Sequence, residues 1–381
     1  MSEARINRIS NESGTGGPTL SGITTFSGLN YFVPPKGTTA ERPSNAPPGS
    51  IRFNTDGAHL EYFDGLQWLE MEAFNVEIGI STAAAPASSG TGHRGIFMCG
   101  GPAPSFNTID YVTISSTGNA IYFGDALAAK TGGGSFSSST RGVRAGSAAA
   151  GNANVIEFVT ISSTGNSQDF GDLLFNFQAP AGASNQTRGI FAGGFNLSSP
   201  GSSNVIQYIT IASTGDAQDF GDLSAAKENL GSFSSSTRGV FAGGSVSNNT
   251  IEYLTISTTG NSLDFGDLLF AKELPGGLSN AVRGIWGGGE GISTDIQFAT
   301  IATTGNAQDF GDLTVSRRQT LGCSSPTRGI WGAGQNPSIA PTTFNVIDYV
   351  TIMSTGNAID FGDLTVSRTI ASAVSNGHGG L

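Results

Sequence analysis

Charge and reactive side chains are scarce in this chain. Only 12% of its 381 residues are charged, and it has 3 histidines and 2 cysteines. Cys99 and Cys323 stand at non-equivalent repeat positions, so they indicate neither a disulfide nor a metal cluster. No apolar run approaches the length of a membrane span, and residues 1–8 lack the apolar core of a signal peptide. The sequence therefore predicts a protein folded in a cytoplasm, with no membrane insertion.

Positive charge is in deficit. The chain has 18 lysines and arginines against 29 aspartates and glutamates, a formal net charge of -11. An acidic surface repels nucleic-acid phosphates and anionic lipids, so neither is an expected partner. Glycine is abundant, with 56 residues, and 24 phenylalanines argue against a disordered chain. This composition predicts an all-β protein with many tight turns.

A two-part motif recurs six times along the chain. Its first part is Asp-Phe-Gly-Asp or a close copy, ending at Asp125, Asp172, Asp222, Asp267, Asp312 and Asp363. Its second part is Arg-Gly, beginning at Arg94, Arg141, Arg188, Arg238, Arg283 and Arg328. Each aspartate up to Asp312 precedes the next arginine by 16 residues. A spacing this regular predicts a repeated structural unit.

Each copy has the pattern of four short strands. In the third copy, residues 188–194, 204–212 and 217–223 predict three strands, and the small-residue segment 224–237 contains a fourth. Four antiparallel strands in about 47 residues are typical of a propeller blade. The sequence therefore predicts a six-bladed β-propeller over residues 79–381, with blades starting near 94, 141, 188, 238, 283 and 328. We expect the tail, residues 364–375, to pair into the first blade and close the ring.

These blades resemble kelch repeats. The matching features are a Gly-Gly pair after an aromatic residue, as in residues 191–194, and two later aromatic residues such as Tyr208 and Phe220. The resemblance covers residues 94–381. The resemblance implies a propeller fold and implies no particular function.

The first 78 residues do not repeat. Residues 1–32 predict an extended N-terminal arm, and residues 33–78 predict a small β-meander with turns at Asp56-Gly57 and Asp64-Gly65. Residues 33–71 carry Gly-Thr-Thr-Ala-Glu-Arg-Pro-Ser-Asn, then Gly-Ser-Ile-Arg-Phe-Asn-Thr-Asp, then Leu-Glu-Tyr-Phe-Asp-Gly-Leu-Gln-Trp. This order resembles a module of tail-fibre and related virion proteins of marine tailed bacteriophages. The resemblance implies a virion structural protein, attached by its N-terminus, with an outward-facing distal domain.

We interpret the repeated arginines and aspartates as structural residues. One of each per copy, in fixed register, predicts rings of ion pairs or of charge-assisted hydrogen bonds between strands or blades. A charged ligand site is the alternative. Calcium requires several oxygens converging on one loop, whereas Asp219 and Asp222 are expected to face different ways on a strand. The sequence supports no metal site, and no cofactor is expected.

An enzyme is the main alternative by fold, because six-bladed propellers include sialidases. Their motif Ser-x-Asp-x-Gly-x-x-Trp is absent, and Asp-Phe-Gly occurs without the Gly-rich loop and His-Arg-Asp of a kinase. His93 and His378 hold equivalent repeat positions, which predicts a seam and not a catalytic base. No catalytic residue is therefore predicted.

The repeat varies most in the loop after its glycines. The longest loops are residues 195–203 and 335–344, in blades three and six, and variable loops on a rigid scaffold are common recognition sites. Tolerated insertions are the plain alternative. The candidate binding residues are Phe195, Asn196, Gln335, Asn336 and Phe344.

Three substitutions share one strand position. Trp286 and Trp331 replace the phenylalanine of other copies, and we expect them to pack in the core. Arg144 takes the same place in the second copy, and we expect it to reach a solvated channel.

The combined reading is a non-enzymatic phage virion protein, a tail fibre or appendage. We expect residues 1–78 to attach to other virion proteins, and the propeller to bind a host-surface glycan or receptor. A small meander cannot bury enough surface alone, so we expect a homo-oligomer, with a trimer favoured. The expected location is the virion, assembled in the host cytoplasm. A head decoration or fibre-joining protein and a carbohydrate-active propeller enzyme are the alternatives.

Overall fold

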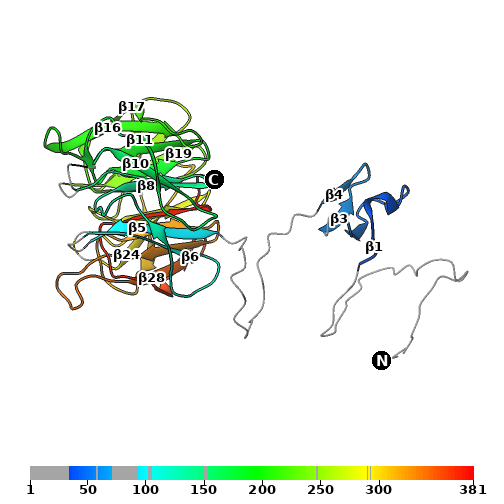
Figure 1. Ribbon diagram of the computed structural model, residues 1–381. Helices are drawn as coiled ribbons and strands as arrows, with labels where there is room; N and C mark the ends of the chain where they lie inside the picture. Colours follow the sequence, from blue (N-terminus) through cyan, green and yellow to red (C-terminus); the bar gives the residue numbers. More distant parts are fainter. Residues whose placement is uncertain are drawn as a thin grey trace, which may run out of the picture. The chain divides into compact units, whose positions relative to one another are not determined.

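The computed structural model describes residues 34–56, 59–70, 93–101, 105–148, 151, 153–245, 248–289, 291 and 293–381. The chain divides into two compact units, Met1–Asn75 and Val76–Leu381, and each is described by itself (Figure 1). The predicted extended arm, residues 1–32, lies outside the described residues. Residue 33 and residues 71–78 of the predicted meander lie outside them too.

The described residues of the first unit form one four-stranded sheet and one helical turn. The strands, in sheet order, are β1 (Lys36–Gly37), β2 (Ile51–Asn54), β3 (His59–Phe63) and β4 (Trp68–Glu70). The three predicted strands are present and pair antiparallel, as β2 with β3 and β3 with β4. β1 adds a parallel strand beside β2, and the 3-10 turn η1 (Thr39–Glu41) connects the two.

The second unit is all-β, with six sheets that share one antiparallel four-strand order. Sheet 1 contains β30 (Ser372–Ser375), β5 (Arg94–Gly100), β6 (Phe106–Thr113) and β7 (Ile121–Asp125). Sheet 2 contains β8 (Gly134–Ser137), β9 (Arg141–Ala145), β10 (Val155–Thr160) and β11 (Gln168–Asp172). Sheet 3 contains β13 (Ala181–Ser184), β14 (Arg188–Ala192), β16 (Gly201–Thr210) and β17 (Gln218–Lys227), extended by β12 (Phe177–Gln178) and β15 (Phe195–Asn196).

The remaining three sheets follow the same order without an extension. Sheet 4 contains β18 (Leu230–Ser234), β19 (Arg238–Gly243), β20 (Thr250–Thr255) and β21 (Leu263–Asp267). Sheet 5 contains β22 (Gly276–Ser279), β23 (Arg283–Gly287), β24 (Asp295–Thr300) and β25 (Gln308–Asp312). Sheet 6 contains β26 (Leu321–Ser324), β27 (Arg328–Gly332), β28 (Val346–Thr351) and β29 (Ile359–Asp363).

Each sheet begins one strand earlier than the sequence repeat indicates. The small-residue strand of one copy pairs with the arginine strand of the next, as β18 does with β19. The expectation that a blade starts at its arginine is therefore wrong by one strand. The shift leaves the last small-residue strand, β30, to pair with β5, where Val374 lies opposite Ile96. Figure 1 shows this red C-terminal strand beside cyan β5.

The small-residue strands of neighbouring sheets lie against one another. β8 contacts β13 and β30, and the series continues through β18, β22 and β26. A Cβ atom built on Gly182, Gly277 or Gly322 would overlap the backbone of the neighbouring strand. Glycine is thus required at these positions for the strands to approach so closely. The arrangement is propeller-like, with the smallest side chains where the sheets converge.

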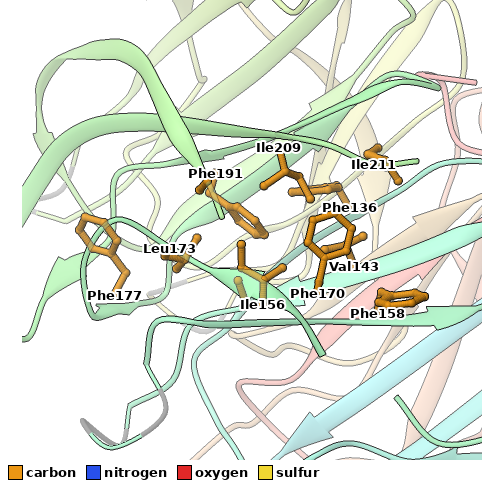
Figure 2. Close-up of a cluster of buried hydrophobic side chains, with 12 residues drawn as sticks. Phe136, Val143, Ile156, Phe158, Phe170, Leu173, Phe177, Phe191, Ile209 and Ile211 are labelled. Carbon is orange, nitrogen blue, oxygen red and sulfur yellow. The ribbon is translucent and has the colours of Figure 1, made fainter. Parts of the chain in front are cut away.

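Buried apolar side chains fill the space between neighbouring sheets. Figure 2 shows the cluster between sheets 2 and 3, where Phe136 packs on Phe191 with ring centroids 4.6 Å apart. Corresponding clusters lie between the other neighbours, and one joins sheet 6 to sheet 1 through Ile330 and Phe97. Trp286 and Trp331 are completely buried in two of these clusters, so their predicted packing role is confirmed.

Candidate functional site

The six repeated arginines connect neighbouring sheets. The guanidinium of Arg238 lies 4.5 Å from the ring centroid of Tyr253 in its own sheet, and its Nη1 donates a 2.8 Å hydrogen bond to the Ile301 carbonyl of the next. Each of the six arginines lies over an aromatic ring of its own sheet and donates to a carbonyl of the next sheet. In chain order, the accepting carbonyls are those of Ile161, Ile211, Ile256, Ile301, Ile352 and Ile114. The last of these connects sheet 6 to sheet 1. The observed interaction is a charge-assisted hydrogen bond, one of the two predicted kinds.

The Asp-Phe-Gly-Asp motif also contacts the next sheet. Phe220 is buried against Tyr208, whereas Gly221 adopts a φ of 147° and would place a Cβ 2.5 Å from the Gly260 carbonyl oxygen of the next sheet. The backbone N–H of Asp222 donates to Asn261 Oδ1 at 3.0 Å. We call these contacts between two neighbouring sheets a joint. The joint therefore uses the backbone of the repeated aspartate.

The corresponding backbone contact is present in all six copies. It joins Asp125 to Asn166, Asp172 to Asp216, Asp222 to Asn261, Asp267 to Asn306, Asp312 to Asn357 and Asp363 to Asn119. Within the part of the chain that the structure describes, none of these aspartates forms an ion pair with a repeat arginine.

Ion pairs between sheets occur at different residues, which the sequence reasoning missed. Lys227 pairs with Glu252, Arg317 Nη2 lies 2.9 Å from Asp348 Oδ2, and Arg368 Nη2 lies 2.6 Å from Asp110 Oδ2. These side chains are almost completely buried. Burial lowers the pKa of both Arg317 and Arg368 from the ordinary arginine value. Burial alone would raise the pKa of Glu252, but hydrogen bonds from Lys227 and Ser262 outweigh it, so this pKa is lowered.

A signal for these pairs is present in the sequence. The residues 5 positions after each repeat aspartate are Lys130, Phe177, Lys227, Lys272, Arg317 and Arg368. The residues 15 positions before it are Asp110, Glu157, Gln207, Glu252, Gln297 and Asp348. Where Phe177 replaces the cation, the next sheet has the neutral Gln207. Where Gln297 replaces the acid, Asp295 instead lies 2.8 Å from Lys272. Charge is thus matched from sheet to sheet.

Arg144 does not reach a solvated channel, and that expectation is wrong. Its side chain is completely buried, and its Nη1 lies 3.3 Å from Glu157 Oε1, which also binds Lys130 at 3.3 Å. Burial alone would raise the pKa of Glu157, but Arg144 and Lys130 outweigh it and the pKa is lowered. Arg144 therefore belongs to the interior between sheets.

His93 lies at the predicted seam. Its Nδ1 is 3.2 Å from the Asn376 carbonyl oxygen, and Asn376 Oδ1 accepts the N–H of Arg94 at 2.8 Å. Asn376 thus caps this strand as Ser138, Asn185, Ser235, Asn280 and Ser325 cap the other five. The C-terminal tail therefore contacts the first strand of the second unit here.

Six equivalent serines connect the small-residue strands in a cycle of hydrogen bonds. Ser184 Oγ donates to the Ser137 carbonyl at 2.7 Å, and Ser137 Oγ donates to the Ser375 carbonyl at 2.7 Å. The same contact continues from Ser375 to Ser324, from Ser324 to Ser279 and from Ser279 to Ser234. The backbone N–H of Ser184 donates to Ser234 Oγ at 3.3 Å and completes the cycle. A cavity of about 170 Å³ lies among these strands and is bordered by all six sheets.

The C-terminal tail lies at the serine end of this cavity. The N–H of Gly379 donates to the Ser279 carbonyl at 3.0 Å, and His378 Nε2 lies 2.9 Å from the Ser137 carbonyl oxygen. His378 Nδ1 accepts the N–H of Gly380 at 3.0 Å, which leaves Nε2 as the protonated nitrogen. Burial lowers the pKa of His378 to about 4. The histidine is therefore a neutral part of the tail and has a structural role.

The candidate binding loops divide into accessible and buried residues. Phe195 and Asn196 form β15, which pairs with both β12 and β16, and they are half-buried. Gln335 is half-buried as well. Asn336 and Phe344, in contrast, are buried, and Asn336 Nδ2 donates to the Ser316 carbonyl at 3.1 Å. These two residues hold the loop itself, and the accessible candidates are Phe195, Asn196 and Gln335.

The other end of the cavity is surrounded by residues that differ between sheets. Seven positions after each repeat aspartate, the chain has a left-handed backbone and carries Gly132, Ala179, Asn229, Leu274, Gln319 and Ile370. The residues just before these are Thr131, Gln178, Glu228, Glu273, Arg318 and Thr369. Burial, together with the nearby charge of Glu273, raises the pKa of Glu228. We call this end the cavity mouth.

Neither cysteine is one of the mouth residues. Cys99 and Cys323 are buried and free, and burial raises the pKa of both, that of Cys99 with smaller effects of nearby charges. A buried thiol of raised pKa is a poor nucleophile and metal ligand. Among the residues described, no group of three or more histidine, cysteine, aspartate and glutamate side chains could hold a metal ion.

The sheet of the first unit has one polar and one apolar face. Glu61, completely buried, accepts hydrogen bonds from Arg42 and from Asn54, and Arg52 lies 3.5 Å away. The hydrogen bond from Arg42 lowers the pKa of Glu61. The opposite face carries Ile51, Phe53, Leu60, Tyr62 and Leu69, which are opposed across the strands. Of residues 34–56 and 59–70, no apolar side chain is buried.

No protein-family model matches the chain, and no curated protein matches it. No helix of the described residues has the length and apolar character of a membrane span. The class that the fold defines is all-β and propeller-like, and the function rests on the geometry above.

Proposed function

We propose that the second unit is a six-bladed, kelch-like β-propeller closed by its C-terminal strand. The pairing of β30 with β5, the apolar cluster between sheets 6 and 1, and the serine cycle support this proposal. Each connects the last sheet to the first by the contact that connects the other neighbours. Closure would give β5 the inner partner strand that each of the other arginine strands has.

We propose that this propeller is a non-enzymatic display scaffold in a phage virion, a tail fibre or appendage that binds a host-surface glycan or receptor. The observation that carries the display role is that the repeated residues are used between the sheets. The arginine, the phenylalanine, the glycine and the aspartate N–H of each motif all contribute to a joint. Only the unrepeated loops and the cavity mouth are left to distinguish one ligand from another.

The first unit supports attachment as its role. Among residues 34–56 and 59–70, the buried residues are the polar Arg52, Asn54 and Glu61, and none of these residues covers the apolar face of the sheet. A small sheet that buries no apolar side chain needs a disulfide, a metal or a partner chain to be stable, and this unit has no cysteine. The proposed partners are copies of the same chain, with a trimer favoured, and other virion proteins. Nucleic acid and membrane are not proposed partners.

Immunogold electron microscopy of intact particles, with antibody against the propeller, tests the virion role. Label on tail fibres is the expected result. Label on the head would favour a decoration or fibre-joining protein, the first alternative. Particles without label would remove the virion assignment and leave the propeller proposal standing.

A carbohydrate-active enzyme is the second candidate, and one pair of residues favours it. Glu228 and Glu273 are adjacent mouth residues from consecutive repeat copies, and the raised pKa of Glu228 suits a general acid. Release of reducing sugar from a glycan panel, abolished by Glu228→Gln, would establish this function. Absence of release under conditions where the protein binds glycan would support display.

A further inference from the structure

One end of the central cavity is covered and the other is accessible. The serines of β8, β13 and β22 are the last residues of these strands, and the tail residues His378 and Gly379 lie against them. The mouth residues precede the same strands, as Ala179 precedes β13 and Leu274 precedes β22. A ligand entering the cavity would therefore come from the mouth.

Mouth residues differ from sheet to sheet, whereas the arginine, the phenylalanine and the glycine of the repeated motif are the same in every sheet. Packing requirements are equal in six equivalent joints, which accounts for the uniformity there. The left-handed backbone at the mouth is also repeated, with φ near 50–70° in every sheet. The side chains carried on it are not repeated and range from glycine to Gln319. The fold thus determines the backbone conformation of the mouth, whereas it does not determine which side chains the mouth carries.

Hydrogen-bonding capacity is unused at this mouth. The side chains of Gln178, Asn229 and Glu273 are half-buried and make no hydrogen bond to the rest of the described chain. By contrast, the buried cations Lys227, Arg317 and Arg368 each pair with an acidic side chain of another repeat copy, although Arg317 Nε and Arg368 Nε have no hydrogen-bond partner in the described chain. A half-buried amide or carboxylate without a protein partner binds water or a ligand.

Apolar groups lie next to these polar ones. Leu230 and Leu274 border the cavity beside Asn229, and Pro275 follows. Asn229 borders the cavity, and Gln178 and Glu273 each directly precede a bordering residue, Ala179 and Leu274. Amides and carboxylates beside an apolar surface match a sugar ring, which presents hydroxyl groups at its rim and C–H groups on its faces. Two glutamates, Glu228 and Glu273, disfavour an anionic sugar.

We propose that the cavity mouth binds a neutral saccharide, with Gln178, Asn229 and Glu273 as its hydrogen-bonding residues. The assignment rests on the proposed function for the source of the saccharide, a host-surface glycan. It places the ligand at the mouth and not on the loops of residues 195–203 and 335–344.

The left-handed backbone allows a sharp test. Asn229→Gly removes the side-chain amide at a φ of 62°, a conformation that glycine adopts freely, so the variant should fold. Ala179→Gly is the matched control, since it has the same repeat position and a φ of 50° but removes only a methyl group. Full-length protein is screened on a glycan array, and the neutral oligosaccharide with the strongest signal is titrated by calorimetry.

We expect Asn229→Gly and Glu273→Gln to weaken binding about tenfold each, the effect of losing one hydrogen bond, with Ala179→Gly within about twofold of wild type. Unchanged binding in both variants, with loss in the loop variant Asn196→Ala, would overturn the mouth site and leave the display function intact. A wild-type protein that binds no glycan on the array would overturn the saccharide site and the glycan role together, while particle labelling would still judge the virion role. Glu273→Gln provides a second, independent variant should Asn229→Gly unfold.

Discussion

A single arginine in each repeat copy connects two sheets by two kinds of contact. Its guanidinium lies over an aromatic ring in its own sheet and donates to a carbonyl at the start of a turn in the next. The arginine must be long enough to reach this carbonyl, because the carbonyl belongs to a backbone that cannot move toward a shorter side chain. Its charge strengthens both contacts. The repeated aspartate, in contrast, contributes its N–H, so its carboxylate is not needed for the joint.

Arg238→Ala should lower the free energy of unfolding by about 2–4 kcal/mol, the combined loss of a charge-assisted hydrogen bond and a cation–π contact. Asp222→Ala is the control and should change it by less than about 0.5 kcal/mol, since the joint uses only the backbone of this residue. Urea unfolding followed by circular dichroism measures both. An Arg238→Ala protein as stable as wild type would show that the arginine serves a ligand and not the fold.

At the scale of elements, neighbouring sheets offer two versions of one joint. Lys227 and Glu252 form the charged version between sheets 3 and 4, and Phe177 and Gln207 occupy the same repeat positions one joint earlier. A buried ion pair often adds little net stability over a well-packed neutral pair, whereas one unpaired buried charge is costly. The two versions therefore explain why these positions change together.

Transplanting the neutral version into the charged joint tests this explanation. Lys227→Phe and Glu252→Gln should each cost about 3 kcal/mol alone, because each leaves a buried group without its partner. The double variant should recover most of that loss. A double-mutant cycle from denaturant titrations supplies the coupling energy, and strictly additive costs would contradict the pairing.

The C-terminal tail makes stability depend on pH through His378. Its pKa is about 4 in the folded chain, below the unfolded value of 6.5, so the unfolded chain binds the proton first as pH falls. Stability is therefore full above pH 6.5 and decreases between about 6.5 and 4, by at most about 3 kcal/mol. Melting temperatures of wild type and His378→Asn across this range should converge at low pH. Parallel curves would exclude the histidine as the cause.

Much of the element level follows from sequence periodicity. The Gly-Gly strand ends, the β-branched second strand and the turns are local features, and the three strands of the meander were predicted on the same grounds. The strand at which each sheet begins could not be predicted from local sequence. A small-residue strand can pair with the strand before or after it, and packing against the two equivalent strands beside it decides the choice. The buried ion pairs were missed for the same reason, since each partner comes from a different copy.

For the whole molecule, the two units differ in what they bury. The second unit encloses apolar clusters between all neighbouring sheets, whereas the described first unit buries only polar side chains. A chain with this contrast should have a self-sufficient propeller and an N-terminal unit that depends on association.

Light scattering of the full-length chain should therefore report a homo-oligomer. Leu60→Asp places a charge on the apolar face of the first unit and should shift the mass toward the monomer. Leu66→Asp, at a turn position that is 92% exposed, is the control and should leave the mass unchanged. A monomeric wild-type chain would contradict self-association and leave other virion proteins as the partners.

The sequence by itself determined the class of fold and the six-part repeat, because strand alternation, turn residues and spacing act over a few positions. It also determined the burial of Trp286 and Trp331, which stand where other copies have phenylalanine. Tertiary structure alone decided that the arginine binds a carbonyl, that Arg144 is buried, and that Asn336 and Phe344 hold their own loop. Those outcomes depend on atoms from different copies of the repeat, and only packing brings these atoms together.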